Sequence, residues 1–213
     1  MAIVVIGGQS RNLGKTSVIA GIIAALPRLN WIAFKLTQFG HGRCSLDGKP
    51  CHCATDDHCF AISEEKDAAG RSDTSRFLAA GAMRSFWVRT EQGRLAEALP
   101  AIQRRLAEAE NSILESNSIL QFINPDLYIT VLDPSTKDFK ASARSYLRRA
   151  DAVVLHPTRG LDDAPPEFLL PDAGCRVFRI LPPEYASGDL IAFIRARLER
   201  ASAAMPSAFP ASS

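Results

Sequence analysis

Short apolar segments alternate with amphipathic segments along most of the chain. The first apolar segment, residues 2–6, is rich in β-branched side chains and ends at two glycines, which is typical of a strand buried on both faces of a sheet. From Val18 onward, apolar residues recur at helical spacing until Pro27. The same reasoning predicts further strands at 31–36, 86–89, 112–115, 127–132, 152–155 and 176–181, and further helices at 73–82, 91–110, 139–149 and 188–202.

Strands that alternate with helices indicate a parallel sheet covered by helices on both faces. We therefore predict an α/β protein with a three-layer α/β/α architecture and a mainly parallel sheet. Residues 1–202 are expected to form one domain, and the Ala-, Ser- and Pro-rich residues 203–213 are expected to be a disordered tail. Right-handed crossovers place the loops that follow parallel strands along one edge of the sheet, where ligands bind in such folds.

The junction between the first strand and the first helix has the sequence of a phosphate-binding loop. Gly14-Lys15-Thr16 lies where backbone N–H groups at a helix N-terminus point toward an anion. In such a loop Lys15 reaches the β- and γ-phosphates, and the Thr16 hydroxyl binds Mg²⁺. We expect the loop and the first helical turn to surround the phosphates through Ser10, Arg11, Asn12, Leu13, Gly14, Lys15, Thr16 and Ser17.

One position of this loop departs from the usual spacing G-x-x-x-x-G-K-[ST]. Gln9 stands where the pattern has its first glycine, and Gly8 comes one residue early. The first glycine shapes the turn more than it contacts phosphate, so the prediction of a phosphate-binding loop stands, with an ordinary strand–helix turn as the alternative. The loop predicts a nucleotide phosphate and does not identify the base.

Composition and charge narrow the class of protein. The net charge of +2 gives no argument for binding nucleic acid or an anionic membrane surface. No apolar stretch approaches the ~20 residues that span a bilayer. The apolar N-terminus lacks a positively charged flank and a cleavage site, so we expect no signal peptide and a cytoplasmic protein.

A cluster of cysteines lies in residues 40–72, a segment with little periodicity that is expected to be a long loop insertion. Its members are Cys44, Cys51, Cys53 and Cys59. In a reducing compartment such a cluster indicates metal or redox chemistry, and four thiolates suit Zn²⁺ or an iron–sulfur cluster. The spacing does not distinguish these two, and an irregular loop without a metal is the alternative.

Three acidic residues near the ends of elements are candidates for the metal side of the nucleotide site. Glu115 ends a short apolar segment and would hold the Mg²⁺ water shell or orient a nucleophile, unless it faces solvent as a helix-capping acid. Asp133 also ends a strand and is an alternative to Glu115. Asp73 opens a helix, where capping of the helix N-terminus is the simpler interpretation.

Several polar residues in loops after strands extend this candidate site. Arg11 would reach a phosphate or the active site of a partner, or else remain an exposed charge. Asn117 and Ser118 would add polar contacts to a substrate. Residues 158–162 follow the strand at 152–155, where loops of nucleotide-binding sheets often contact the base, but their sequence matches a guanine-binding pattern only weakly.

Several segments together resemble the molybdopterin-guanine dinucleotide biosynthesis protein B family, which belongs to the signal-recognition and nitrogenase-iron-protein-like class of phosphate-loop proteins. Lys35-Leu36-Thr37 stands where the family has Lys-x-Thr after its second strand. Residues 70–76 and Ala80-Gly81-Ala82 stand where it has Gly-Lys-Asp-Ser/Thr, Arg and Ala-Gly-Ala. Members commonly lack the first glycine of the loop, so Gln9 agrees with the family. The resemblance covers roughly residues 1–120.

Two departures from this family bear on function. The family has Val-Glu-Gly after its third major strand, and this chain has Leu114-Glu115-Ser116, so the glutamate carries over and the glycine does not. The Cys-rich residues 41–60 are an insertion beyond the compact family pattern. Such an insertion is compatible with a relative that serves another metallocofactor.

The resemblance implies a nucleotide-binding protein, with GTP favoured over ATP, that assists assembly of the molybdenum cofactor or another metallocofactor together with a protein partner. It implies phosphate binding by Gly14, Lys15 and Thr16, with Mg²⁺ at Thr16, Asp73 and Glu115. Lys15 and Glu115 would be the catalytic residues, turnover would be slow, and dimerisation is expected by analogy. Two alternatives stay open, namely a nucleotide-regulated Zn²⁺ or iron–sulfur sensor or carrier, and a kinase or ligase whose small acceptor contacts residues 116–118.

Overall fold

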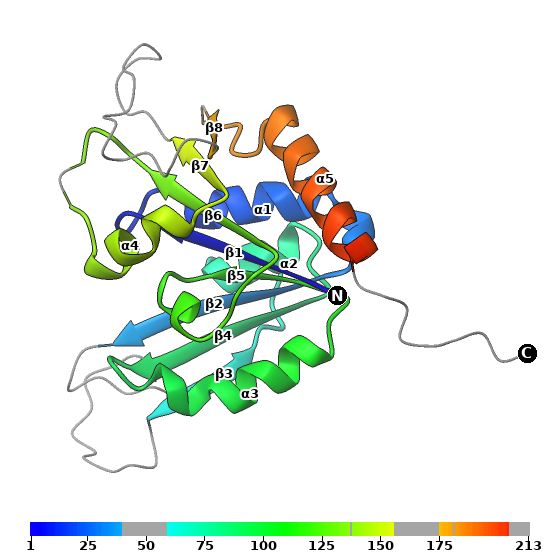
Figure 1. Cartoon of the computed structure of the whole chain (residues 1–213). Helices are drawn as coiled ribbons and strands as arrows, with labels where there is room; N and C mark the ends of the chain where they lie inside the picture. Colours follow the sequence, from blue (N-terminus) through cyan, green and yellow to red (C-terminus); the bar gives the residue numbers. More distant parts are fainter. Residues whose placement is uncertain (40–58, 137, 156–174, 181, 205–213) are drawn as a thin grey trace, which may run out of the picture.

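The computed structural model describes residues 1–39, 59–136, 138–155, 175–180 and 182–204. Within these residues eight strands form one sheet in the order β3-β4-β2-β5-β1-β6-β7-β8 (Figure 1). The strands are β1 (Ala2–Gly8), β2 (Trp31–Phe39), β3 (Phe60–Glu64), β4 (Arg84–Glu91), β5 (Asn111–Glu115), β6 (Leu127–Leu132), β7 (Ala152–Leu155) and β8 (Arg176–Arg179). The helices are α1 (Lys15–Ala25), α2 (Asp73–Ala79), α3 (Leu95–Ala107), α4 (Ala141–Tyr146) and α5 (Gly188–Ala204), with short 3₁₀ helices η1 (Pro27–Leu29), η3 (Ser118–Gln121) and η4 (Leu147–Arg149).

The strand pairs are parallel except for β3 with β4, which is antiparallel. Helices cover both faces of the sheet, so the predicted three-layer α/β/α architecture with a mainly parallel sheet is confirmed. The interior strands are apolar along almost their whole length because both of their faces are buried. β6, with the sequence LYITVL, is buried at every position.

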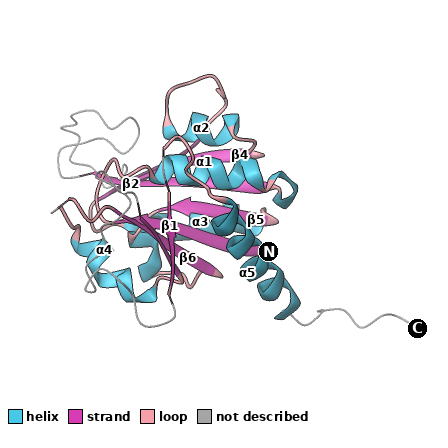
Figure 2. Ribbon diagram, turned by 90° about the horizontal axis from the view of Figure 1, so that it is seen from above, coloured by secondary structure: helices cyan, strands magenta, loops and turns pink. Residues whose placement is uncertain are grey.

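Alternate residues of each central strand contribute to two different cores. Val4 and Ile6 of β1 pack with α1 and α5, whereas Val5 packs with α3 on the opposite face. Figure 2 shows α1 and α2 together over one face of the sheet, and Figure 1 shows α3 on the other side. The period-2 geometry of a strand therefore places Ile6, at the carboxyl end of β1, on the α1 face.

The register across the sheet brings three strand ends to one place. Glu115 of β5 lies opposite Ile6 of β1 on one side and opposite Lys35 of β2 on the other. Parallel strands carry paired residues on the same face, so Lys35 and Glu115 both project toward the layer that contains α1 and α2. The carboxyl edge of the sheet is therefore assembled around the end of β5.

Several sequence predictions are wrong in their bounds. The helix expected at 73–82 ends at Ala79, and the helix expected at 139–149 is the shorter α4, followed by η4. Residues 40–72 are not loop throughout, because residues 60–64 form the edge strand β3 paired with β4. The helix expected from residue 91 begins at Leu95, since β4 continues through Glu91. The helix expected to end at 202 runs to Ala204, and residues 205–213 lie outside the described part of the chain.

No helix among the described residues is both long enough and apolar enough to cross a membrane.

Candidate functional site

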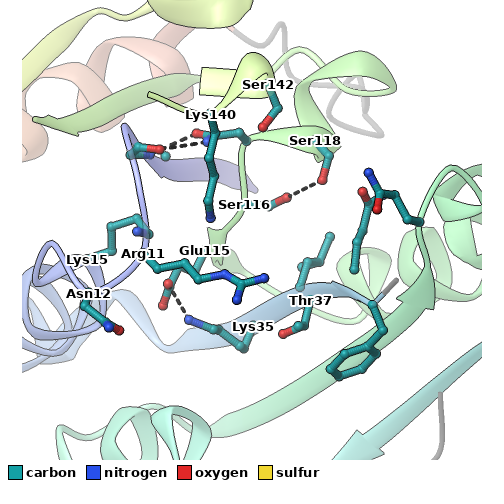
Figure 3. A pocket seen from close by; sticks show the side chains of 17 residues that line it. Arg11, Asn12, Lys15, Lys35, Thr37, Glu115, Ser116, Ser118, Lys140 and Ser142 are labelled. Atoms are coloured by element: carbon teal, nitrogen blue, oxygen red, sulfur yellow. Dashed lines mark hydrogen bonds and ion pairs between the residues drawn. The ribbon is translucent and has the colours of Figure 1, made fainter. Parts of the chain in front are cut away.

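A cleft of about 700 Å³ opens at the carboxyl edge of the sheet. Its walls come from the loop after β1, the end of β2, the residues after β4 and β5, and the start of α4 (Figure 3). This volume falls in the range of about 300–1,000 Å³ that is usual for small-molecule sites. The cleft therefore lies where the sequence predicts a phosphate-binding site.

The phosphate loop reaches α1 through Gly14, the residue that precedes the helix. Gly14 has φ 78°, a left-handed conformation that a side chain rarely adopts, so the glycine is needed for the turn into the helix. The first turn of α1 contains no acidic residue. Its first N–H groups have no partner within the helix, and the helix dipole adds positive potential there. The start of α1 is therefore suited to an anion.

The side chain of Lys15 lies across this loop, and its ammonium group is largely buried. Its Nζ donates a hydrogen bond to the carbonyl oxygen of Ser10 at 2.6 Å, and a Cβ at Gly8 would be only 2.7 Å from Lys15 Cδ. Burial lowers the pKa of Lys15 to about 8, with Glu115 opposing this shift and Lys140 adding to it. The ammonium group is therefore costly to keep charged until an anion approaches.

Four side chains from four elements meet beside Lys15, and we call them the Lys35 network. They are Thr16 of α1, Lys35 of β2, Asp73 of α2 and Glu115 of β5. Glu115 Oε2 accepts from Thr16 Oγ1 at 2.9 Å. Figure 3 shows the ion pair between Glu115 Oε1 and Lys35 Nζ. Lys35 Nζ also lies 2.9 Å from Asp73 Oδ2. The first helix, the sheet and α2 are thus joined through one ammonium group.

Each charge in this network supports its neighbours. Burial alone would lower the pKa of Lys35, but Glu115 and Asp73 raise it above its ordinary value. Burial alone would raise the pKa of Asp73, but the hydrogen bond and ion pair with Lys35 hold it below its usual range, with a contribution from Thr16. Lys35 therefore remains charged and Asp73 remains ionised at neutral pH.

The network changes the interpretation of both acids. Glu115 is 4% exposed, which excludes the alternative of a solvent-facing capping acid. Asp73 is not the residue that caps α2, because Ser72 Oγ accepts the N–H of Ser75 at 2.9 Å. Asp73 is the first residue of the helix, and its carboxylate turns to Lys35 instead.

The same residues fit the chemistry of Mg²⁺, which prefers oxygen ligands and retains several waters. A hydroxyl from Thr16 and carboxylates from Asp73 and Glu115 meet at the side of the phosphate loop. Both carboxylates already share Lys35, so the site carries one internal cation before any metal arrives.

Gln9, the residue that breaks the usual loop pattern, is 2% exposed and hydrogen bonded at both ends of its amide. Its Nε2 donates to the carbonyl oxygen of Thr136 at 2.9 Å, and its Oε1 accepts from the N–H of Asp133 at 3.0 Å. Its own carbonyl oxygen accepts from the N–H of Lys140 at 2.9 Å. The side chain of Gln9 therefore connects the phosphate loop to the segment after β6. A glycine has no side chain to make these two bonds.

Asn117 connects the loop to the end of β5. Its carboxamide makes two hydrogen bonds to the main chain of Gly8, accepting from the N–H at 2.9 Å and donating to the carbonyl oxygen at 2.8 Å. Asp133, the alternative metal acid, instead accepts from the N–H and hydroxyl of Ser135 at 2.9 and 2.7 Å. Its carboxylate thus supports a turn and does not line the cleft.

The remaining loop residues divide into two groups. Arg11 and Asn12 line the cleft with exposed side chains. Leu13 packs its side chain into the core, and the Ser17 hydroxyl accepts from Arg76 at 2.8 Å, so these two would reach a phosphate only through their N–H groups. The Ser10 hydroxyl donates to the carbonyl oxygen of Arg11 at 3.1 Å.

The predicted cysteine cluster falls mainly on residues that the structure does not describe. Cys44, Cys51 and Cys53 lie outside the described residues, as do residues 158–162. Cys59 precedes β3, and a hydrogen bond to Glu97 raises the pKa of its thiol. Among the described residues, no group of three or more Cys, His, Asp or Glu side chains is placed to hold a metal ion.

Two residues in this region were not predicted as site residues from the sequence. Lys35 carries a family-like signal, Lys-x-Thr at the end of the second strand, although its role as the partner of two acids is not evident from that pattern. Lys140 has no such signal. It lies eight residues after β6, immediately before α4, and its N–H is bonded to the carbonyl oxygen of Gln9 at the cleft.

Comparison with solved structures places this chain beside HypB from Helicobacter pylori in complex with nickel. The two share 13% sequence identity with a TM-score of 0.51, over 97% of this chain and 90% of HypB. LpxK from Aquifex aeolicus in complex with ATP is also similar, with 20% identity and a TM-score of 0.46 over 84% of this chain and 53% of LpxK. No protein-family model and no curated protein matches the sequence. The chain has the P-loop NTPase fold.

Proposed function

We propose that this protein binds a nucleoside triphosphate with Mg²⁺, GTP in preference to ATP, and hydrolyses it slowly to assist assembly of a metallocofactor. One observation carries the nucleotide part of this proposal. Lys15 and the start of α1 lie directly beside a buried Glu115 whose carboxylate is bonded to the Thr16 hydroxyl. Cation, helix N-terminus, hydroxyl and carboxylate are the groups that a triphosphate and its Mg²⁺ require.

In this proposal the backbone N–H groups of α1 and the Lys15 ammonium bind the β- and γ-phosphates. Thr16 would hold Mg²⁺, with Glu115 and Asp73 on its outer side, and the metal would neutralise charge that develops on the phosphates. Among the described residues that line the cleft, Glu115 is the acidic one, and it is already bonded to Thr16 and Lys35. General-base activation of water is therefore weak, which supports slow turnover.

The cofactor-assembly part rests on two weaker supports. One is the resemblance to the molybdopterin-guanine dinucleotide family over roughly residues 1–120, which also favours GTP, a protein partner and a dimer. The other is the similarity of fold to HypB, which was solved with nickel. Both point to a protein that handles metals, and neither specifies molybdenum.

The first test is release of phosphate from GTP and from ATP by wild type and by Lys15→Ala. We expect slow release that depends on Lys15, with GTP preferred. Arg104→Met is a matched control, because Arg104 is an exposed cation on α3 away from the cleft and should leave the rate unchanged. Equal release by wild type and Lys15→Ala, with metal and candidate partners present, would exclude the hydrolase.

The alternative of a metal sensor or carrier rests on the cysteine cluster alone. Metal analysis of anaerobically purified protein tests it, with the double variant Cys51→Ser/Cys53→Ser as the comparison. We expect stoichiometric zinc or iron in wild type and loss of that metal in the variant. Equal trace metal in both proteins would exclude the metal centre.

A further inference from the structure

The cleft is larger than the phosphate loop requires, and it extends in a definite direction. From β1 it continues over β5 and β2 to Gln92, which follows β4. β4 is three strands from β1, roughly 14 Å across the sheet. β7, after which loops of nucleotide-binding sheets often contact the base, lies on the other side of β1. This part of the cleft therefore points away from the expected nucleoside and beyond the terminal phosphate.

We call this part the outer cleft and define it by Arg11, Thr37, Gln92, Ser116, Ser118 and Lys140. Figure 3 shows Lys140 entering it from the start of α4, with Arg11 crossing from the phosphate loop toward Thr37. The two cations thus reach the same space from segments that are far apart in the sequence.

Charge in the outer cleft is unbalanced. Lys35, at its base, is neutralised by Asp73 and Glu115. Within the described part of the chain, neither Arg11 nor Lys140 forms an ion pair, and both line the cleft. Burial, with the nearby charge of Arg11, lowers the pKa of Lys140, although the exposed Asp138 and the buried Glu115 oppose this shift. An anion between Arg11 and Lys140 would relieve this repulsion, since each cation gains an opposite charge.

Hydrogen-bonding groups surround the two cations. Thr37 Oγ1 accepts from Trp87 Nε1 at 3.1 Å, which leaves its own O–H to donate. The hydroxyls of Ser116 and Ser118 lie 3.3 Å apart on the same wall. Phe39 lines the cleft, and its ring lies edge to face with that of Trp87, with the two ring centroids 6.4 Å apart. The outer cleft therefore offers two cations and several hydroxyls above an aromatic base.

We propose that the outer cleft binds a second ligand beside the nucleotide, a small polar molecule that carries a phosphate monoester. Arg11 and Lys140 bind its phosphate, and the hydroxyls of Thr37, Ser116 and Ser118 bind its polar body. This assignment rests on the proposed function only in placing a nucleotide in the neighbouring phosphate loop.

The chemical class follows from charge and geometry. A phosphate monoester carries about two negative charges at neutral pH, which matches two single cations, whereas a carboxylate leaves one of them unpaired. The guanidinium of Arg11 presents a planar pair of donors suited to two phosphate oxygens. A neutral polyol would leave both cations unsatisfied.

The experiment is calorimetric titration of glycerol 3-phosphate, glycerate and glycerol into protein saturated with Mg²⁺ and the β–γ imido analogue of GTP. We expect glycerol 3-phosphate to bind, glycerate to bind about tenfold more weakly, and glycerol to give no heat. The double variant Arg11→Met/Lys140→Met should lose about tenfold or more of the affinity for glycerol 3-phosphate. The double variant Arg28→Met/Arg104→Met removes the same two positive charges from exposed positions outside the cleft, and it should bind as wild type does.

The outcomes separate this inference from the proposed function. If the loaded wild type binds none of the three probes, or if the double variant binds glycerol 3-phosphate unchanged, the outer-cleft site is overturned. It is also overturned if the single variant Lys140→Met loses nucleotide affinity as Lys15→Ala does, since Lys140 then serves the nucleotide. If wild type binds no nucleotide, but Lys15→Ala still binds glycerol 3-phosphate through Arg11 and Lys140, the second site stands and the nucleotide proposal fails.

Discussion

The Lys35 network and the cations around it, Lys15, Arg11 and Lys140, occupy the same cleft and differ in how their charge is balanced. In the network, the positive charge of Lys35 is met within the protein by two carboxylates, which leaves the network with a net charge of about −1. Lys15 bonds to a carbonyl oxygen, and Arg11 and Lys140 form no ion pair among the described residues. The difference suggests a division of roles. The network stabilises the fold, whereas Lys15, Arg11 and Lys140 keep their positive charges available to bind anionic ligands.

The substitution Lys35→Met is expected to have the largest effect on stability. It leaves the buried carboxylate of Glu115 without its ammonium partner, and breaking a buried pair in this way costs about 3–5 kcal/mol. We expect that loss in the free energy of unfolding, measured by urea denaturation. The double variant Lys35→Met/Glu115→Gln should recover part of it. A loss below about 1 kcal/mol would remove the distinction between the two regions.

Lys15→Ala tests the other side of the comparison. We expect the affinity for a GTP analogue to fall about 10- to 150-fold, which corresponds to about 1.5–3 kcal/mol for a charged hydrogen bond. The ligand-free protein should be as stable as wild type or more stable, because a half-buried cation without a carboxylate partner is removed. Calorimetry and urea denaturation give the two quantities. A loss of stability comparable to that of Lys35→Met would contradict the comparison.

Gln9→Gly restores the usual first glycine of the loop and sharpens the boundary between folding and binding. It removes both side-chain hydrogen bonds to residues 133–136 and leaves a buried N–H at Asp133 without its acceptor. We expect the free energy of unfolding to fall by about 1–3 kcal/mol. Nucleotide affinity should change by less than about threefold, since the side chain faces away from the cleft. A tenfold change in affinity would place Gln9 in the binding site.

A pH titration tests the charge of Lys15 without any substitution. Lys15 has its pKa lowered to about 8, so above that pH nucleotide binding must first protonate it. Affinity should fall by up to about tenfold per pH unit above about pH 8. In the ligand-free protein the sign is opposite. Between about pH 8 and the ordinary lysine pKa of 10.5, the unfolded chain binds more protons than the folded one, so the free energy of unfolding rises with pH there. In Lys15→Arg the nucleotide affinity should not change with pH between about 8 and 10.5, because arginine stays protonated there.

Local pattern was sufficient to predict most elements of the fold. β6 and β7 have the predicted bounds because their apolar runs are complete and are bounded by polar residues. β3 was missed because residues 60–64 form a strand only through pairing with residues 86–90, far away in the sequence. The start of α3 was misplaced because the register of β4 on β2 extends the strand to Glu91.

The site followed the same rule. The nearness of Asp73 and Glu115 to the phosphate loop was predictable because their positions match a known pattern, and their roles stay a prediction. Whether Ser72 or Asp73 caps α2 was not predictable, because both residues suit a cap. A lysine on β2, 38 residues away, decides it by forming an ion pair with Asp73. The role of Gln9 likewise depends on a segment more than 120 residues away.

The two bonds between Asn117 and the main chain of Gly8 carry a consequence for how ligands would influence one another. Asn117 lies between the two serines of the outer cleft, and Gly8 belongs to the phosphate loop. If a ligand is held by those serines, Asn117 is the side chain that joins their segment to the loop. Thermodynamic reciprocity requires that if such a ligand tightens nucleotide binding by some factor, the nucleotide tightens it by the same factor. The carboxamide of Asn117 would then couple the two sites, so that the protein responds most strongly when both ligands are bound.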